Sequence, residues 1–160
     1  MKTTPRTATL LLALAAVAQA GAQGGQLRVT PGEVKWPASG SSLVGTSGVS
    51  GIQTTTLKGD ATKAGLYTML LRVGPNTKIQ PHSHPDDRVA TVISGTWYFG
   101  YGRTFDEKAL KELPTGSVYT EPPNVDHFAM TKGDVVIQIT GTGPSGTTYV
   151  DPKNDPARKP

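Results

Sequence analysis

The chain of 160 residues contains no cysteine. This absence excludes disulfide bonds, thiolate metal ligands and thiol nucleophiles, so the core must stabilise any folded domain. Histidine and tryptophan are scarce, with three and two residues. The excess of one charge sign is small as well, a net +4 from 16 basic and 12 acidic residues. Because the basic residues are scattered rather than arranged in a stripe, we expect no nucleic-acid partner.

Long apolar runs are missing except near the N-terminus. Lys2 and Arg6 precede the apolar segment TLLLALAAVA, which ends in the small-x-small tripeptide AQA at 18–20. This combination is typical of a secretory signal peptide, and the apolar run is too short for a membrane-spanning helix of roughly 20 residues. We therefore predict a signal peptide at residues 1–20, cleavage after Ala20, and a periplasmic or secreted protein with no membrane span in its mature form.

Glycine and proline are abundant, with 19 and 13 residues. They separate short runs rich in β-branched and aromatic residues, which is typical of an all-β domain with many turns. The predicted strands are Ile52–Leu57, Leu66–Val73, Lys78–His84, Arg88–Ser94, Thr96–Tyr101, Ser117–Glu121, His127–Thr131 and Val135–Thr140. Short strands at about ten-residue spacing indicate a sandwich or a barrel.

The rest of the chain divides around these strands. Residues 21–50 are expected to form an N-terminal extension with a first strand, residues 51–150 the barrel, and residues 151–160 a disordered tail. Trp36 is a candidate to pack against the barrel. Beyond the signal peptide, helical spacing is confined to residues 105–114, FDEKALKELP, where the apolar side chains share one helix face before a proline. One short helix or turn is predicted there.

The three histidines have the spacing of a metal site. His82 and His84 lie two residues apart in IQPHSHP, so on a strand their side chains point to the same face. His127 adds an imidazole from the distant segment EPPNVDHFAM. Three imidazoles suit one divalent transition metal, whether Fe, Mn, Zn, Cu or Ni. The alternative is two solvated surface histidines and one buried, hydrogen-bonded one.

The residues around the histidines resemble the two motifs of the cupin family. The segment 74–95, GPNTKIQPHSHPDDRVATVISG, matches the first motif at Gly74, His82, His84 and Gly95. The segment 116–131, GSVYTEPPNVDHFAMT, matches the second at Gly116, Pro122 and His127, with Asn124 in place of a glycine and Thr131 in place of an asparagine. Asn tolerates the left-handed backbone that favours glycine. The resemblance implies a single double-stranded β-helix, or jelly-roll barrel, with a three-histidine metal site, and a homodimer.

The resemblance breaks at Arg88, which occupies the position of the family's glutamate ligand. A guanidinium has no free lone pair for a metal, and at roughly 6 Å from a dication it would be repelled by about 5 kcal/mol at an effective dielectric of ~20. We therefore expect Arg88 at the cavity mouth, either paired with Asp86 or Asp87 or free to bind the carboxylate of a substrate. Arg88→Glu is expected to tighten metal binding by restoring a ligand.

Other residues are candidates for the pocket. Tyr119 and Glu121 share one face of a strand that leads into the second motif. Glu121 has three interpretations: it replaces the missing carboxylate ligand, acts as a general base, or is solvated at the strand end. Gln138, in an apolar run, either bonds a metal-bound water or a histidine, or faces solvent. Alternation in TWYFGYG places Trp97, Phe99 and Tyr101 on one face and Tyr98 on the other.

These patterns leave two functional hypotheses open. Three neutral imidazoles leave a metal its full charge and open positions, which suits dioxygen insertion at iron, as the resemblance to cupin dioxygenases implies, and hydroxide on zinc equally. The first hypothesis is an exported metal-dependent oxygenase, or a related enzyme, that acts on a small polar or acidic molecule. The second is a cupin module that binds a small molecule or a metal without turnover. The change at Arg88 favours the second.

Overall fold

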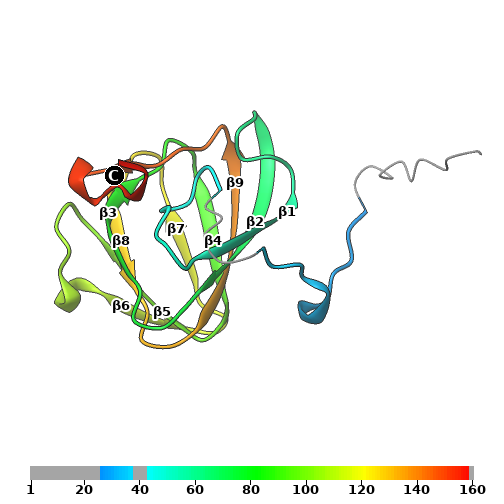
Figure 1. The fold of residues 1–160 in the computed structure, drawn as a ribbon, viewed down its shortest axis with the longest axis horizontal. Coiled ribbons are helices and arrows are strands. Elements are labelled where there is room, and N and C mark those ends of the chain that lie inside the picture. The colour runs from blue at the N-terminus through cyan, green and yellow to red at the C-terminus, as the bar shows by residue number, and fades with distance from the viewer. Residues whose placement is uncertain (1–25, 38–42, 159–160) are drawn as a thin grey trace, which may run out of the picture.

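The computed structural model describes residues 26–37 and 43–158, and in it two five-stranded antiparallel sheets pack face to face (Figure 1). The first sheet has the order β1 (Gln53–Lys58), β2 (Gly65–Val73), β9 (Val135–Gly143), β4 (Arg88–Ser94) and β7 (Val118–Glu121). The second has the order β10 (Thr148–Tyr149), β3 (Lys78–Ser83), β8 (His127–Met130), β5 (Thr96–Tyr101) and β6 (Lys111–Pro114). The prediction of an all-β jelly-roll barrel is confirmed.

The barrel forms because each long strand has one apolar face. On β9, buried and less buried residues alternate along the strand, since successive side chains point to opposite faces. Ile137 and Ile139 of β9 meet Leu71 and Met69 of β2 across the ladder, and all four are buried. The apolar faces of both sheets enclose one core, which leaves the two ends of the barrel for polar groups.

The eight strands predicted between residues 52 and 140 are all present, but the segment between β5 and β7 differs from its helical pattern. Glu107–Ala109 forms a 3-10 turn, in which the Asp106 side chain accepts a hydrogen bond from the Lys108 amide at 2.9 Å. The rest of that segment is β6, where Leu113 is buried opposite Trp97 on β5. The partner strand therefore overrides the helical spacing, because pairing buries Leu113 and satisfies the backbone of β6.

Asn124 and Thr131, which stand in the second motif in place of a glycine and an asparagine, both have structural roles. Asn124 has a left-handed φ of 59°, as predicted, and its amide donates to the His84 carbonyl at 2.7 Å. Thr131 is fully buried. Its hydroxyl donates to the Gly74 carbonyl at 2.6 Å and accepts from the Thr77 amide at 3.0 Å. These bonds tie the two motif segments together.

The described segments before β1 and after β10 differ in part from the predictions. The predicted signal peptide lies outside the described residues. Residues 26–37 and 43–50 contain a 3-10 turn at Pro31–Glu33 and no strand, so the first strand predicted within 21–50 is absent from this part. Trp36 packs on the barrel as expected, with the Arg72 guanidinium 4.2 Å from its ring centroid. At the C-terminus, where a disordered tail is predicted, Pro152–Asn154 and Pro156–Arg158 form 3-10 turns.

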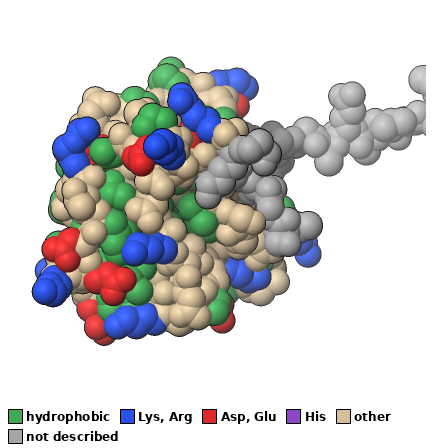
Figure 2. All heavy atoms as spheres, turned by 60° about the vertical axis from the view of Figure 1, so that its left-hand side comes forward, with side chains coloured by type: hydrophobic (Ala, Val, Ile, Leu, Met, Phe, Trp, Pro, Cys, Tyr) green, Lys and Arg blue, Asp and Glu red, His purple; other side chains and the backbone are tan. Residues whose placement is uncertain are grey.

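Basic and acidic side chains are interspersed with hydrophobic ones on the face drawn in Figure 2. Among residues 26–37 and 43–158, no helix is long and apolar enough to cross a membrane.

Candidate metal centre

The structure brings the three histidines together. His82 on β3 and His127 at the start of β8 are direct partners in the ladder, and His84 follows the end of β3. One ring nitrogen from each lies within 4.8 Å of those of the other two. All three side chains are buried, with 2–5% of their surface exposed. The alternative of two solvated surface histidines is therefore wrong, and this cluster could bind a metal ion.

Backbone carbonyls fix which ring nitrogen faces the cluster. The Nδ1 atoms lie 2.8 Å from the Gln80 carbonyl for His82, 2.6 Å from the Gly146 carbonyl for His84, and 3.0 Å from the Val125 carbonyl for His127. Because a carbonyl only accepts, each Nδ1 carries a proton, and in a neutral ring the lone pair is then on Nε2. Burial also lowers the pKa of His82 to about 3 and that of His84 still further. The backbone hydrogen bonds orient the three rings, and Nε2 is the ring atom that could bind an ion.

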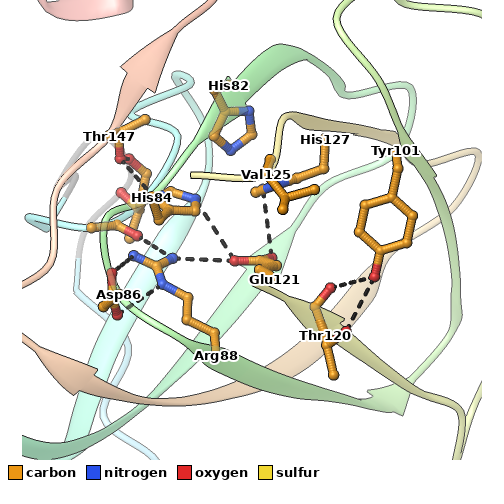
Figure 3. Close-up of polar contacts among 12 residues, drawn as sticks. His82, His84, Asp86, Arg88, Tyr101, Thr120, Glu121, Val125, His127 and Thr147 are labelled. Carbon is orange, nitrogen blue, oxygen red and sulfur yellow. Dashed lines mark hydrogen bonds and ion pairs between the residues drawn. The ribbon is translucent and has the colours of Figure 1, made fainter. Parts of the chain in front are cut away.

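Glu121 faces the same cluster from the other sheet (Figure 3). Its Oε2 lies 3.7 Å from His84 Nε2 and its Oε1 lies 3.8 Å from His127 Nε2. The residue is 5% exposed, so the interpretation of a solvated charge at the strand end is wrong. Glu121 pairs with Arg88 across the β4–β7 ladder. A carboxylate therefore lies beside the histidines, on the residue directly opposite Arg88 in the ladder.

Arg88 is buried, with 2% of its surface exposed, and all of its donors have partners. Its Nε donates to Asp86 Oδ2 at 3.1 Å, and its Nη2 donates to Asp86 Oδ1 at 3.2 Å and to Ser145 Oγ. Its Nη1 donates to the Gly45 carbonyl at 2.7 Å and to Glu121 Oε2 at 3.3 Å. The pairing with Asp86 is therefore present, whereas the expectation that Arg88 lies open at the cavity mouth is wrong. No N–H remains to bind a substrate carboxylate.

Asp86 anchors the far side of this cluster. Its carboxylate accepts hydrogen bonds from the Tyr67 hydroxyl at 2.5 Å and the Ser145 hydroxyl at 2.7 Å as well as from Arg88. Burial would raise the pKa of Asp86, but these hydrogen bonds outweigh it and hold the pKa below its usual value. The two ion-paired carboxylates outnumber the one guanidinium between them. A bound cation would complement this excess of carboxylates.

The remaining predicted pocket residues divide between the inside and the outside of the barrel. Tyr119 shares the inward face with Glu121, as predicted, and burial raises the pKa of its phenol. Trp97 and Phe99 also line the cavity, but Tyr101, from the same predicted face, is half-exposed and donates to the Thr120 carbonyl at 2.6 Å. Gln138 lines a groove on the outer side with Trp36 and Arg72, so it does not face the histidines.

The cavity that these side chains enclose, called the inner cavity below, has a volume of about 30 Å³. A single water needs roughly 10–15 Å³ by this measure, so the space fits an ion and about one or two small ligands. Four buried polar atoms in its wall have no hydrogen-bond partner among the described residues: Ser47 Oγ, Trp97 Nε1, Tyr119 Oη and His127 Nε2. The indole N–H of Trp97 lies near the Tyr119 hydroxyl without hydrogen-bond geometry. Such atoms are costly to bury unless a ligand meets them.

Residues 43–49, called the strap below, close the inner cavity, and no sequence pattern predicted them. Three consecutive strap carbonyls accept hydrogen bonds from side chains of the barrel. Arg88 bonds Gly45, the Thr147 hydroxyl bonds Thr46 at 2.8 Å, and the Tyr149 hydroxyl bonds Ser47 at 2.5 Å. A Gly-Thr-Ser-Gly run has no hydrophobic periodicity, which is the main signal that a sequence offers.

Comparison with known proteins supports the fold. No family model matches the chain. A curated relative, H2HPP isomerase from Bacillus subtilis, is 30% identical over 89 residues, which are 54% of this chain and 36% of the relative, so the chain spans about a third of that protein's length.

Solved structures with a similar fold include an RmlC-like cupin from Shewanella frigidimarina, with a TM-score of 0.54 and 16% identity over 74% of this chain and 91% of that one. KdgF from Halomonas sp. has a TM-score of 0.51 and 16% identity over 74% and 96% of the two chains. A variant of salicylate 1,2-dioxygenase from Pseudoaminobacter salicylatoxidans has a TM-score of 0.51 and 13% identity over 61% and 30%.

Proposed function

Since the chain has the cupin fold, we propose that it binds one divalent transition metal through His82, His84 and His127, with the carboxylate of Glu121 as a fourth ligand. The observation that carries the proposal is the set of three Nε2 lone pairs and one carboxylate that converge in a closed, buried cavity. Ligand atoms in a tetrahedral or octahedral metal site lie roughly 3–4 Å apart, and the separations of Glu121 from two of the histidines fall in this range.

The three imidazoles and the carboxylate fit a divalent transition metal. Imidazole nitrogens suit Zn, Cu, Fe and Ni, and a carboxylate adds affinity for Mn and Fe. When bound, the metal supplies a Lewis acid with positions open to a small ligand. Arg88 is a positioning residue in this proposal, because it holds the Glu121 carboxylate toward the histidines. The unpartnered Tyr119 hydroxyl is available as a donor to a ligand beside the metal.

We propose further that the protein is an enzyme of the metal-dependent oxygenase or isomerase kind, acting on a small polar molecule. The names of two similar proteins, salicylate 1,2-dioxygenase and H2HPP isomerase, support this class, although they resemble this chain in fold or over part of their length. A second candidate, a metal-binding module without turnover, is favoured by the small volume of the inner cavity and by the buried ligands.

Elemental analysis of the protein purified from its native compartment tests the metal proposal. We expect one equivalent of a transition metal per chain, and calorimetric titration of the metal-free protein should give one site. If none of the transition metals tested binds to the protein, the proposed metal site is overturned. A turnover of small polar substrates by the loaded protein, absent from the metal-free form, would favour the enzyme over the binding module.

Export and dimerisation complete the proposal. The basic N-terminal region, the apolar run and the AQA tripeptide support cleavage after Ala20, so mass spectrometry of the exported protein should show a chain that begins at Gly21. A mature chain that begins at Met1 would contradict this. The homodimer implied by the family resemblance is tested by the molar mass in solution.

A further inference from the structure

The inner cavity is too small for an organic molecule while the strap is in place. Its volume of about 30 Å³ is far below the several hundred Å³ of ordinary small-molecule sites. Gly45, Thr46 and Ser47 are part of its wall. Any organic ligand that reaches the metal must therefore displace this wall or another part of the barrel.

A larger pocket, called the outer pocket below, lies against the same strap residues. It has a volume of about 390 Å³ and is lined by strap residues, by 146–149 and by 155–157. Gly45, Thr46 and Ser47 line both spaces. The strap thus borders both a metal-sized cavity and a ligand-sized pocket.

The strap is held to the barrel by hydrogen bonds from a few side chains. Apart from Arg88, the side chains that bind it belong to Thr147 and Tyr149, beside or within the two-residue edge strand β10. The strap also has left-handed glycines at both sides of Thr46 and Ser47, with φ of 83° at Gly45 and 69° at Gly48. Glycine has more accessible backbone conformations than other residues. The Ser47 hydroxyl, between these glycines, has no hydrogen-bond partner among the described residues.

From these observations we infer that the strap is the gate of the site, and that the ligand it admits is a small molecule that binds the metal through an oxygen or nitrogen atom and carries no charge at its other end. This inference rests on the proposed metal site. With the strap displaced, the inner cavity and outer pocket form one space, in which the ligand contacts the metal at one end and the residues 155–157 at the other.

The charge of the ligand follows from the lining. Every N–H of Arg88 is bonded within the protein, and no other Lys or Arg side chain of the described residues lines either space. Asp155 of the outer pocket pairs with the exposed Arg158 at 3.4 Å, which leaves no excess of positive charge there. Away from the metal, an anionic group of the ligand would thus find no ion pair to compensate its desolvation.

The test uses the full-length mature protein loaded with Co²⁺, whose visible spectrum reports a change of ligands. The loaded protein is mixed with isonicotinamide, an uncharged pyridine, and the rate of the spectral change is recorded. Tyr149→Phe removes the hydroxyl that bonds Ser47 while keeping the ring, so it should raise this rate roughly three- to tenfold, the factor that one hydrogen bond is worth. Thr147→Val should act in the same direction.

Tyr101→Phe is the matched control. It removes a hydroxyl that bonds a backbone carbonyl in the same way, Thr120 rather than the strap, and the rate should stay within about twofold of the unchanged protein. Equal rates in Tyr149→Phe, Tyr101→Phe and the unchanged protein would overturn the gate.

A second measurement tests the charge. Isonicotinate has the same ring nitrogen as isonicotinamide and nearly the same shape, but it is an anion. Relative to their affinities for free Co²⁺, isonicotinamide should bind the protein at least about fivefold more tightly. Tighter binding of isonicotinate would overturn the inference about charge. Failure to load Co²⁺ would reject the proposed metal site, whereas full loading with no response to either probe, in the variants too, would reject the gate alone.

Discussion

The two sheets supply the candidate metal centre with different kinds of groups. The second sheet provides the imidazoles of His82 on β3 and His127 on β8, each fixed by a hydrogen bond to the backbone. The first sheet provides charges, with Arg88 on β4 and Glu121 on β7, fixed by side chains that bond one another. Ligand geometry therefore resides mainly in one sheet, and charge balance in the other. The energetic cost of a buried charge depends on its ion-pair partners. Substitutions on the charged side, in the first sheet, and on the imidazole side, in the second, should therefore have different consequences.

The largest effect is expected on stability, from the charged side. Arg88→Met leaves the buried carboxylates of Asp86 and Glu121 without their shared cation, so the free energy of unfolding should fall by about 3–5 kcal/mol. Urea denaturation of the metal-free protein measures this. For the same reason we now expect Arg88→Glu to destabilise the fold rather than to improve metal binding. If the free energy of unfolding of Arg88→Met stays within about 1 kcal/mol of that of the unchanged protein, Arg88 does not stabilise the two buried carboxylates.

The next effect is expected on metal affinity, from the imidazole side. His127→Ala removes one of three nitrogen ligands, so the affinity for Zn²⁺ should fall by roughly 100-fold or more, above the 10–100-fold cost of disturbing a ligand's hydrogen-bond partner. Competitive titration with a zinc indicator measures it. Folding should persist because the core is unchanged, and circular dichroism is the control. Unaltered affinity would place the metal elsewhere.

A smaller effect on affinity is expected from Glu121→Gln, which joins the two sides. The amide keeps the shape of the carboxylate and one oxygen toward the histidines but loses the charge, so the affinity should fall by about tenfold, in the lower part of the range for such changes. Glu112→Gln, on β6 and exposed, is the matched control and should change nothing. If both variants bind Zn²⁺ like the unchanged protein, Glu121 is not a ligand.

The smallest effect is expected for an ion pair that has the same chemistry without burial. Arg103 pairs with Asp126 at 2.8 Å, but the Arg103 side chain is 74% exposed. Exposed pairs contribute about 0–1 kcal/mol, so Arg103→Met should change the free energy of unfolding by less than about 1 kcal/mol, measured as for Arg88→Met. A loss as large as that of Arg88→Met would mean that burial does not distinguish the two arginines.

The fold was largely predictable because strand signals are local. Alternation and turn residues located the strands, and the two motifs indicated the barrel. Strand β6 was missed because the apolar spacing of Ala109, Leu110 and Leu113 also fits a helix, and only the presence of β5 alongside decides between them. Register across a sheet is set by residues far apart in the chain, which periodicity does not contain.

The site was predictable on its imidazole side and less so on its charged side. His82, His84 and His127 follow from spacing within two motifs. The role of Glu121 depends on its pairing with Arg88, 33 residues away, and this pairing is a property of the ladder. Tyr67, Ser145 and the strap could not be found from the sequence, because their contribution is a contact with groups that other segments position.

The bonds from the three imidazoles to Gln80, Gly146 and Val125 end on main-chain oxygen atoms, and this bears on how the protein can change over generations. A side-chain partner is lost when its codon mutates, whereas a carbonyl belongs to every residue type. Gln80 and Val125 are partly exposed, so most replacements there leave the orientation of His82 and His127 intact. The centre is therefore expected to tolerate drift at the neighbours of its ligands while permitting almost none at the ligands.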